Sequence, residues 1–194
     1  MPLPSQIIRQ KFPYEPTQGQ NRLFDLLDEF LDKKSGPPIL IIKGYAGTGK
    51  TSFVSALVKI LPLFNFKFLL LAPTGRAAKV MSAYAKRTAF TIHKIIYKQV
   101  ADPSSGQLRF RRVDNYNRNT VFIVDEASML SANSAFGDAG VLSDLLSFVF
   151  EKPGNKLILI GDTAQLPPVG QEASLGLEVD HVSSLVNKRA LEIE

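Results

Sequence analysis

Residues 39–51 read Ile-Leu-Ile-Ile-Lys-Gly-Tyr-Ala-Gly-Thr-Gly-Lys-Thr. Its first part, residues 39–42, is wholly apolar, which is typical of a strand that is buried on both faces. A glycine-rich turn follows, and residues 52–61 then have a composition compatible with a helix. A strand that passes through a glycine-rich turn into a helix is the arrangement that holds phosphate groups at a helix N-terminus.

The turn matches a phosphate-binding pattern at every fixed position. The pattern is G-x-x-x-x-G-K-[ST], and its fixed residues here are Gly44, Gly49, Lys50 and Thr51. Glycine allows the positive φ angles that turn backbone N–H groups inward, and the helix adds the positive end of its dipole. Lys50 can then reach the β- and γ-phosphates, and the Thr51 hydroxyl can bind Mg²⁺. The predicted nucleotide-binding residues are Gly44, Tyr45, Ala46, Gly47, Thr48, Gly49, Lys50, Thr51 and Ser52.

The composition is that of an ordinary globular domain. The chain has 194 residues, of which 45% are hydrophobic and 21% charged, and its net charge of +5 is compatible with a polyanionic partner. It contains no cysteine, which excludes a disulfide framework and a thiolate metal site. No apolar run is long enough to span a bilayer, so we expect a cytoplasmic protein without a membrane partner.

Three further apolar runs end in clusters of polar residues. Residues 64–71, 121–124 and 157–160 are interpreted as buried strands with helical segments between them. Together with residues 39–42 they predict an α/β fold in which helices cover both faces of a parallel sheet. The loops at the carboxyl ends of such strands meet at one edge, where folds of this kind bind ligands.

The segments outside these strands are less regular. Residues 1–16 contain four prolines and are expected to be an irregular lead-in. Residues 98–113 alternate around a turn-rich centre, which predicts a two-stranded hairpin. Residues 130–140 are expected to be a long loop, and residues 169–194 carry no strong signature.

Two carboxylates directly follow the apolar run 121–124. Asp125 fits a carboxylate that holds Mg²⁺ through its hydration shell, and Glu126 is placed to orient or deprotonate an attacking water. Asp162 and Gln165 follow the next strand, where a neutral amide could sense the γ-phosphate. A plain polar turn is the alternative interpretation of that second pair.

Gln20 has two interpretations. With Thr17 three residues before it, the side chain fits a capping box at the start of a helix. The same amide could bond the edge of an adenine base. The sequence leaves both roles open.

Hydroxyl groups and cations follow the second strand and the segment after it. Thr74, Arg76 and Thr91 have the chemistry of contacts to a phosphate backbone. His93, taken alone, is more often a structural histidine than a contact of this kind. Arg109 and Arg111 lie in the predicted hairpin, which is either a solvated face or a nucleic-acid contact.

Taken together, the motifs resemble the first motor domain of superfamily 1 helicases, most closely the RecD-like and Dda-like 5′-to-3′ DNA helicases. The segments that carry the resemblance follow the family's order: Gly-Tyr-Ala-Gly-Thr-Gly-Lys-Thr-Ser at 44–52, Ala-Pro-Thr-Gly-Arg-Ala-Ala-Lys-Val-Met at 72–81, Thr-Ile-His-Lys at 91–94, Ile-Val-Asp-Glu-Ala-Ser-Met at 123–129 and Gly-Asp-Thr-Ala-Gln-Leu-Pro-Pro-Val-Gly at 161–170. The resemblance implies a RecA-like domain over residues 17–194 that uses ATP and Mg²⁺ and binds single-stranded and duplex DNA. It leaves a nuclease or recombination partner open.

The resemblance also assigns roles to individual residues. It implies that Gln20 contacts adenine, that Lys50 contacts phosphate and that Thr51 and Asp125 bind the metal. Glu126 is then the catalytic base and Gln165 the γ-phosphate sensor. The implied nucleic-acid contacts are Pro73, Thr74, Gly75, Arg76, Thr91 and His93, and residues 98–119 occupy the place of a strand-separating pin that carries Arg109 and Arg111.

The sequence departs from the family at two points. The centre of the predicted hairpin, residues 102–106, has no aromatic residue that could stack as a wedge. The chain ends at Glu194, before the arginine-bearing motif and the second motor domain. An arginine finger is worth ~10³–10⁵ in rate. We therefore expect an amino-terminal fragment that binds nucleotide weakly, hydrolyses it slowly and does not translocate.

Two other classes of protein stay open at this stage. A P-loop enzyme such as a small-molecule kinase would need an arginine-bearing lid over an acceptor pocket. A non-catalytic module could instead bind nucleic acid through residues 109–118, without regard to nucleotide. Oligomeric state is not indicated by the sequence.

Overall fold

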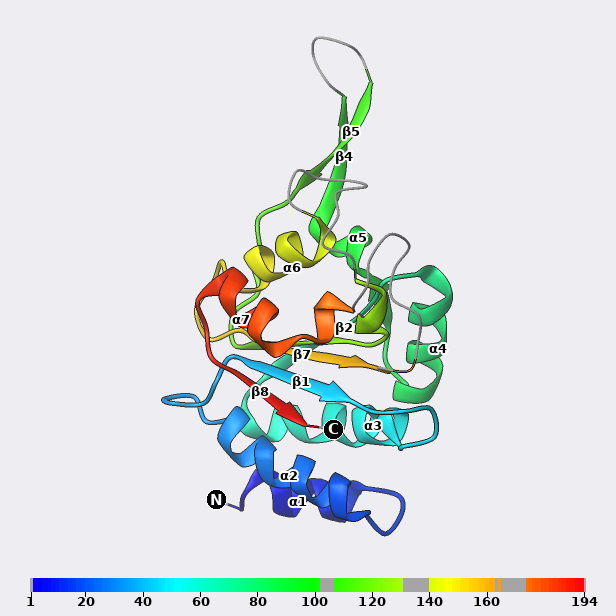
Figure 1. Cartoon of the computed structure of the whole chain (residues 1–194), viewed down its shortest axis with the longest axis vertical. Helices are drawn as coiled ribbons and strands as arrows, with labels where there is room; N and C mark the ends of the chain where they lie inside the picture. Colours follow the sequence, from blue (N-terminus) through cyan, green and yellow to red (C-terminus); the bar gives the residue numbers. More distant parts are fainter. Residues whose placement is uncertain (1, 102–106, 131–139, 163, 165–173, 194) are drawn as a thin grey trace.

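The centre of the molecule is a sheet of six parallel strands with helices on both faces (Figure 1). The computed structural model describes residues 2–101, 107–130, 140–162, 164 and 174–193. The strands lie in the order β3-β2-β6-β7-β1-β8. Their bounds are Ala89–Thr91 for β3, Lys67–Ala72 for β2, Thr120–Val124 for β6, Lys156–Gly161 for β7, Ile39–Lys43 for β1 and Ala190–Ile193 for β8. The predicted parallel α/β fold is confirmed.

Alternate residues of each central strand enter two separate cores. Leu40 and Ile42 of β1 pack on one face, and Ile39 and Ile41 pack on the other. The first core is closed by α1 (Pro4–Lys11), α2 (Gln18–Phe30), α3 (Lys50–Ile60) and α4 (Gly75–Ala85). The second is closed by α5 (Ile92–Ile96), α6 (Val141–Val149) and α7 (Val179–Val186). Burial on both faces explains why these strands are continuous apolar runs rather than alternating ones.

The expectation of an irregular lead-in over residues 1–16 is wrong for α1. Pro4 stands in the first helical turn, where its missing N–H costs no hydrogen bond. Ile8 is fully buried in the first core, and the hydroxyl of Ser5 donates to Asp28 of α2 at 2.7 Å. The amino-terminal segment is therefore part of the packed domain.

Two short strands form the edges of the sheet; the one at residues 190–193 and the helix before it were not indicated by the sequence. β3 pairs with β2, and β8 pairs with β1 at the opposite edge of the sheet. α7 and β8 lie within residues 169–194, which lack a sequence signature. The strand predicted at residue 64 begins at Lys67 instead, because Leu61–Phe64 form a 3₁₀ turn, η1, that ends in left-handed Asn65.

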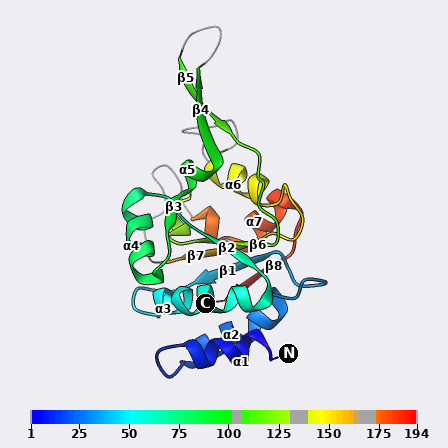
Figure 2. The ribbon, with the colours of Figure 1, turned by 180° about the vertical axis from the view of Figure 1, so that it is seen from behind.

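A two-stranded hairpin stands off the body of the molecule in both views (Figures 1 and 2). It consists of β4 (Tyr97–Ala101) and β5 (Leu108–Arg112), which pair antiparallel as predicted. All five residues of β5 are exposed. At the base, the Tyr97 hydroxyl donates to Oδ2 of Asp144 at 2.6 Å and joins the hairpin to α6.

Some predictions fall on segments outside the described residues. These segments are the hairpin centre at 102–106, most of the expected long loop at 131–139, and Gln165. The ends of the expected loop are described: Leu130 is buried, and Gly140 precedes α6. None of the helices in the described ranges is long and apolar enough to cross a membrane.

Candidate nucleotide-binding site

The loop between β1 and α3 has the backbone shape that its glycines predict. Gly47 and Gly49 have φ angles of +83° and +89°, in the left-handed region. A Cβ atom on Gly49 would lie 2.5 Å from Nε2 of Gln20. The N–H of Gly44 donates to the carbonyl of Gly161 at 3.1 Å, which ties the start of the loop to the end of β7.

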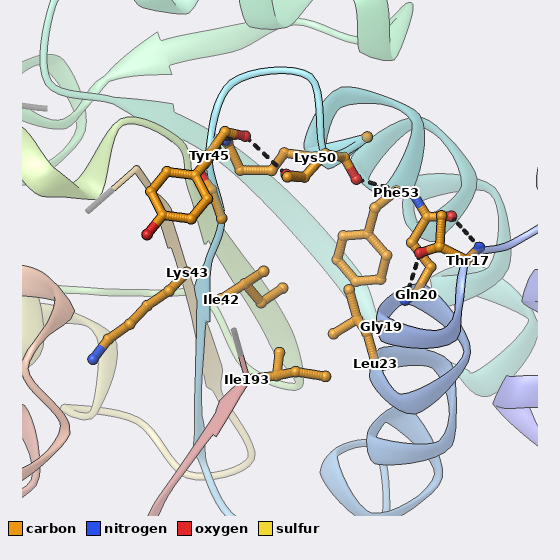
Figure 3. Close-up of a pocket in the computed structure, with 13 residues that line it drawn as sticks. Thr17, Gly19, Gln20, Leu23, Ile42, Lys43, Tyr45, Lys50, Phe53 and Ile193 are labelled. Atoms are coloured by element: carbon orange, nitrogen blue, oxygen red, sulfur yellow. Dashed lines mark hydrogen bonds between the residues drawn. The ribbon is translucent and has the colours of Figure 1, made fainter. Parts of the chain in front are cut away.

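The Lys50 ammonium lies against the loop itself (Figure 3). Its Nζ donates to the carbonyl oxygens of Gly44 at 2.5 Å and Tyr45 at 2.7 Å. Carbonyls are weaker acceptors for an ammonium than ionised phosphate oxygens. Lys50 is therefore held close to the position where a phosphate would bind, by contacts that a phosphate could replace.

The loop borders a cavity of about 550 Å³ that also contains two carboxylates. Glu126, at the end of β6, and Asp162, at the end of β7, both line this cavity. The predicted loop residues on its wall are Ala46, Gly47, Gly49, Lys50, Thr51 and Ser52. Segments far apart in the chain therefore meet around one space at the carboxyl edge of the sheet.

A second cavity, of about 250 Å³, is also lined by Gln20 and Lys50 (Figure 3). Apolar side chains from α2, β1, α3 and β8 form much of its wall: Leu23, Ile42, Phe53 and Ile193. Lys43, at the end of β1, and Tyr45, in the phosphate loop, also line this cavity. Gln20, Gly49 and Lys50 line both cavities, so the two spaces are neighbours.

Gln20 forms the capping box and contacts the loop at the same time. Its Oε1 accepts from the N–H of Thr17 at 3.0 Å, and Oγ1 of Thr17 accepts from the N–H of Gln20 at 3.3 Å. The amide nitrogen Nε2 donates to the carbonyl of Thr48 at 2.9 Å. Capping therefore leaves the amide group at the nucleotide loop, while its contact to adenine stays a prediction.

Asp125 has both carboxylate oxygens engaged. Oδ2 accepts from the Tyr84 hydroxyl at 2.6 Å, and Oδ1 accepts from the N–H of Glu126 at 2.9 Å. Burial raises the pKa of the Tyr84 hydroxyl above its ordinary value, and the charge of Asp125 raises it further. Tyr84 therefore stays protonated and acts as a donor. No sequence signal pointed to Tyr84, which lies 41 residues from Asp125 along the chain.

Glu126 also borders a third cavity, of about 350 Å³, on the side of α4. Thr74, Arg76 and Asp125 line this space as well. Oγ1 of Thr74 accepts from the N–H of Ala77 at 3.2 Å and caps α4, and Arg76 is exposed in the first turn. Glu126 thus stands between the nucleotide-loop cavity and a space lined by predicted nucleic-acid residues.

The other predicted nucleic-acid residues are spread more widely. Pro73 is half-buried and Gly75 is exposed, next to Thr74. Oγ1 of Thr91 accepts from the N–H of Lys94 at 3.2 Å and caps α5. Burial lowers the pKa of His93, whose ring lies 5.5 Å from that of Tyr97. Arg109 and Arg111 lie on the hairpin and line none of the three cavities.

The donor set fits a magnesium ion that arrives with a nucleotide. In the described part of the chain, no three His, Cys, Asp or Glu side chains come together as a metal site. Mg²⁺ bound to substrate phosphates needs only one or two protein ligands, because water and phosphate oxygens complete its octahedron. Thr51 and Asp125 are the predicted pair: Thr51 lines the cavity of the phosphate loop, and Asp125 lines the neighbouring cavity that shares Glu126 with it.

Strand order, phosphate loop and convergent carboxylates define the chain as a P-loop NTPase with the RecA-like α/β fold. Residues 25–185 match the family model described as AAA domain, and the chain belongs to that family.

Two relatives agree with the resemblance to RecD-like helicases. The ATP-dependent RecD2 DNA helicase of Deinococcus radiodurans is 33% identical over 157 residues, which cover 79% of this chain and 19% of that protein. The RecBCD enzyme subunit RecD of Haemophilus influenzae is 31% identical, over 72% of this chain and 23% of that protein. The predicted membership of the RecD-like motor domains is confirmed. The chain spans less than a quarter of the length of either relative.

A solved structure shares the fold. The crystal structure of Pif1 helicase from Bacteroides, in complex with ADP-AlF3 and single-stranded DNA, matches 80% of this chain and 34% of its own. The TM-score is 0.50 and the sequence identity 23%. This likeness supports the RecA-like architecture of the chain.

Proposed function

We propose that the chain is the ATP-binding motor domain of an ATP-dependent DNA helicase or translocase that moves 5′ to 3′. The observation that carries the proposal is the position of Glu126. It lines the cavity of the phosphate loop together with Lys50, and it lines the cavity of Thr74 and Arg76 as well. A residue at this boundary can respond to both nucleotide and nucleic acid.

The chemistry would be hydrolysis of ATP. The loop N–H groups and Lys50 would hold the β- and γ-phosphates, with the ammonium leaving the carbonyls of Gly44 and Tyr45. Thr51 and Asp125 would hold Mg²⁺, which when bound neutralises phosphate charge. Glu126 would orient and deprotonate the attacking water. Gln165 would sense the γ-phosphate, a role that rests on the family resemblance.

The base and ribose would extend toward the second cavity. Its apolar walls suit the faces of an adenine ring, and the Gln20 amide stands between this cavity and the phosphate loop. Because the cap uses Oε1 and the bond to the Thr48 carbonyl uses one hydrogen of Nε2, a second amide hydrogen stays available for a ring nitrogen. Capping and adenine contact are therefore compatible in this site.

DNA would cross the carboxyl edge of the sheet. Pro73, Thr74, Gly75 and Arg76 precede or begin α4, and Thr91 and His93 lie at the start of α5, so hydroxyls and helix N-termini face the same side. Arg109 and Arg111 on β5 would add phosphate contacts further out. Recombination or nuclease subunits are the partners, and the cytoplasm the compartment, that this function implies.

The kinase alternative is disfavoured by the walls of the nucleotide cavity. Among the residues that the structure describes, no arginine lines the cavity of Lys50 and Glu126. A phosphoryl-transfer enzyme would need such cations over its acceptor pocket. A nucleotide-independent module would instead bind DNA equally well with and without nucleotide.

The test is nucleotide binding by this chain and phosphate release by the longer protein that contains it. Titration with a fluorescent ATP analogue should show Mg²⁺-dependent binding that Lys50→Ala abolishes. Single-stranded DNA should accelerate phosphate release by the longer protein, and Glu126→Gln should remove that release while ATP still binds. DNA binding that is indifferent to nucleotide, together with unchanged phosphate release in Lys50→Ala, would overturn the proposal.

A further inference from the structure

Tyr84 connects three elements near the predicted metal carboxylate. Its hydroxyl, from the last turn of α4, donates to Oδ2 of Asp125 at the end of β6, at 2.6 Å. Its carbonyl accepts from Oγ of Ser55 at 2.8 Å, and Ser55 belongs to α3, the helix that follows the phosphate loop. One residue therefore links the loop helix, α4 and the carboxylate.

The same helix begins among the predicted nucleic-acid residues. Thr74 caps α4, and Arg76 in its first turn lines a cavity together with Asp125 and Glu126. Tyr84 lies in the last turn of this 11-residue helix. Helices move as rigid bodies when packed side chains shift between two arrangements. A displacement of the first turn would therefore reach the hydroxyl of Tyr84.

The hydroxyl fixes the orientation of the Asp125 carboxylate. The other carboxylate oxygen is held by the backbone N–H of Glu126, so the group is restrained at both atoms. With a phenylalanine at position 84, only the backbone contact would remain. Partners of this kind orient metal ligands, and their loss commonly costs ~10–100-fold in metal affinity.

We propose that Tyr84 is a positioning residue that holds Asp125 for metal binding and couples the orientation of that carboxylate to the nucleic-acid end of α4. The inference rests on the proposed function, because it assumes that Asp125 serves a Mg²⁺–nucleotide complex. It adds a residue that acts through Asp125 and does not itself contact the metal.

The test compares Tyr84→Phe with the unchanged chain, using Mn²⁺ as the probe. Binding of Mn²⁺ to the chain with saturating ADP is measured by electron paramagnetic resonance, with and without single-stranded DNA. The affinity for Mn²⁺ should fall about tenfold in Tyr84→Phe, while the affinity for ADP without metal stays the same. DNA should change the Mn²⁺ affinity of the unchanged chain and have a smaller effect in the variant.

The matched control is Tyr97→Phe. The Tyr97 hydroxyl also donates to an aspartate oxygen at 2.6 Å, but its partner Asp144 lines none of the three cavities. Both variants lose one tyrosine–aspartate hydrogen bond, and we expect similar drops in melting temperature. Only Tyr84→Phe should change Mn²⁺ binding. A second variant, Ser55→Ala, removes the other contact of Tyr84 and should weaken Mn²⁺ binding in the same direction.

The possible outcomes separate this inference from the proposed function. Equal Mn²⁺ affinity in Tyr84→Phe and the unchanged chain would overturn the role of Tyr84 and leave the proposed function intact. An equal loss of Mn²⁺ affinity in Tyr97→Phe would also overturn the role of Tyr84, because the loss of either tyrosine–aspartate hydrogen bond would then have the same effect. A chain that binds neither ADP nor Mn²⁺ before any substitution would instead overturn the proposed function.

Discussion

At the scale of single residues, the shape of the phosphate loop depends on Gly49 and its neighbour Gln20. Gly49 has a φ of +89°, and a Cβ there would meet the Gln20 amide nitrogen at 2.5 Å. That amide donates to the carbonyl of Thr48 within the loop. A side chain at position 49 would therefore strain the backbone and displace the contact that joins α2 to the loop.

We predict that Gly49→Ala weakens both stability and nucleotide binding. The left-handed backbone costs ~1–2 kcal/mol for a residue with a Cβ, and displacement of Gln20 adds to it. Urea unfolding should show this loss, and a fluorescent ATP analogue should bind more weakly, because the Gln20 amide is displaced from its contact with the loop.

The control for this prediction is Gly19→Ala. A Cβ on Gly19 meets nothing within 4 Å, and the residue stands in the first turn of α2. Its effect on the free energy of unfolding should stay within ~0.5 kcal/mol. Equal behaviour of the two alanine variants would contradict the role given to Gly49.

The loop and the carboxylates could be predicted from the sequence because their signals are local. The phosphate-binding pattern occupies consecutive residues, and Asp125 directly follows an apolar run. The contact of Tyr84 with Asp125 depends on how α4 packs, across 41 residues of chain, and no local pattern carries it. Gln20 is an intermediate case. The sequence predicted its capping box with Thr17, but it did not predict the hydrogen bond from its side chain to the Thr48 carbonyl.

At the scale of elements, α1 is a structural part of the domain. Ile8 is fully buried, Arg9 pairs with Asp25 of α2 at 2.6 Å, and Ser5 bonds Asp28. The prolines of the amino-terminal segment had indicated an irregular chain, but one of them starts the helix. The edge strand β8 was missed because its four residues are too few for a periodic signal.

We predict that Ile8→Ala destabilises the whole chain. Truncation of a fully buried isoleucine removes apolar contact and leaves a cavity, which costs ~2–5 kcal/mol. Denaturant unfolding, followed by circular dichroism, measures the change. Leu3→Ala, at a residue that is 50% exposed, is the control and should change the free energy of unfolding by less than ~0.5 kcal/mol. A marginal effect of Ile8→Ala would mean that α1 is detached from the core in solution.

At the scale of the whole molecule, the ligand cavities and the hairpin lie on different parts. The three cavities lie by the phosphate loop, the carboxyl ends of the strands and the first turn of α4, while β4 and β5 stand off the body (Figure 1).

The strands of the hairpin place Lys98 directly opposite Arg111. Like charges in facing positions repel, and an anion between them relieves the repulsion. This arrangement favours a phosphate backbone as the partner of the hairpin.

We predict that the double substitution Arg109→Ala and Arg111→Ala weakens DNA binding and lowers its salt dependence. Each phosphate contact to single-stranded DNA contributes about 0.7 to the slope of log K against log salt, so the slope should fall by about 1.4. Fluorescence anisotropy at several salt concentrations measures it. The charge-preserving lysine pair should keep the slope. An unchanged slope in the alanine pair would exclude the hairpin from the DNA interface, and ATP binding should be the same in all variants.

The contacts of the Lys50 ammonium bear on which anions the phosphate loop prefers. Its Nζ donates to the carbonyls of Gly44 and Tyr45 and keeps its charge in these bonds, so a ligand must offer better acceptors than both carbonyls. Inorganic phosphate must break these two bonds with few compensating contacts, whereas a nucleoside triphosphate brings further phosphates and a base. The loop would therefore discriminate against small cellular anions in favour of the larger ligand.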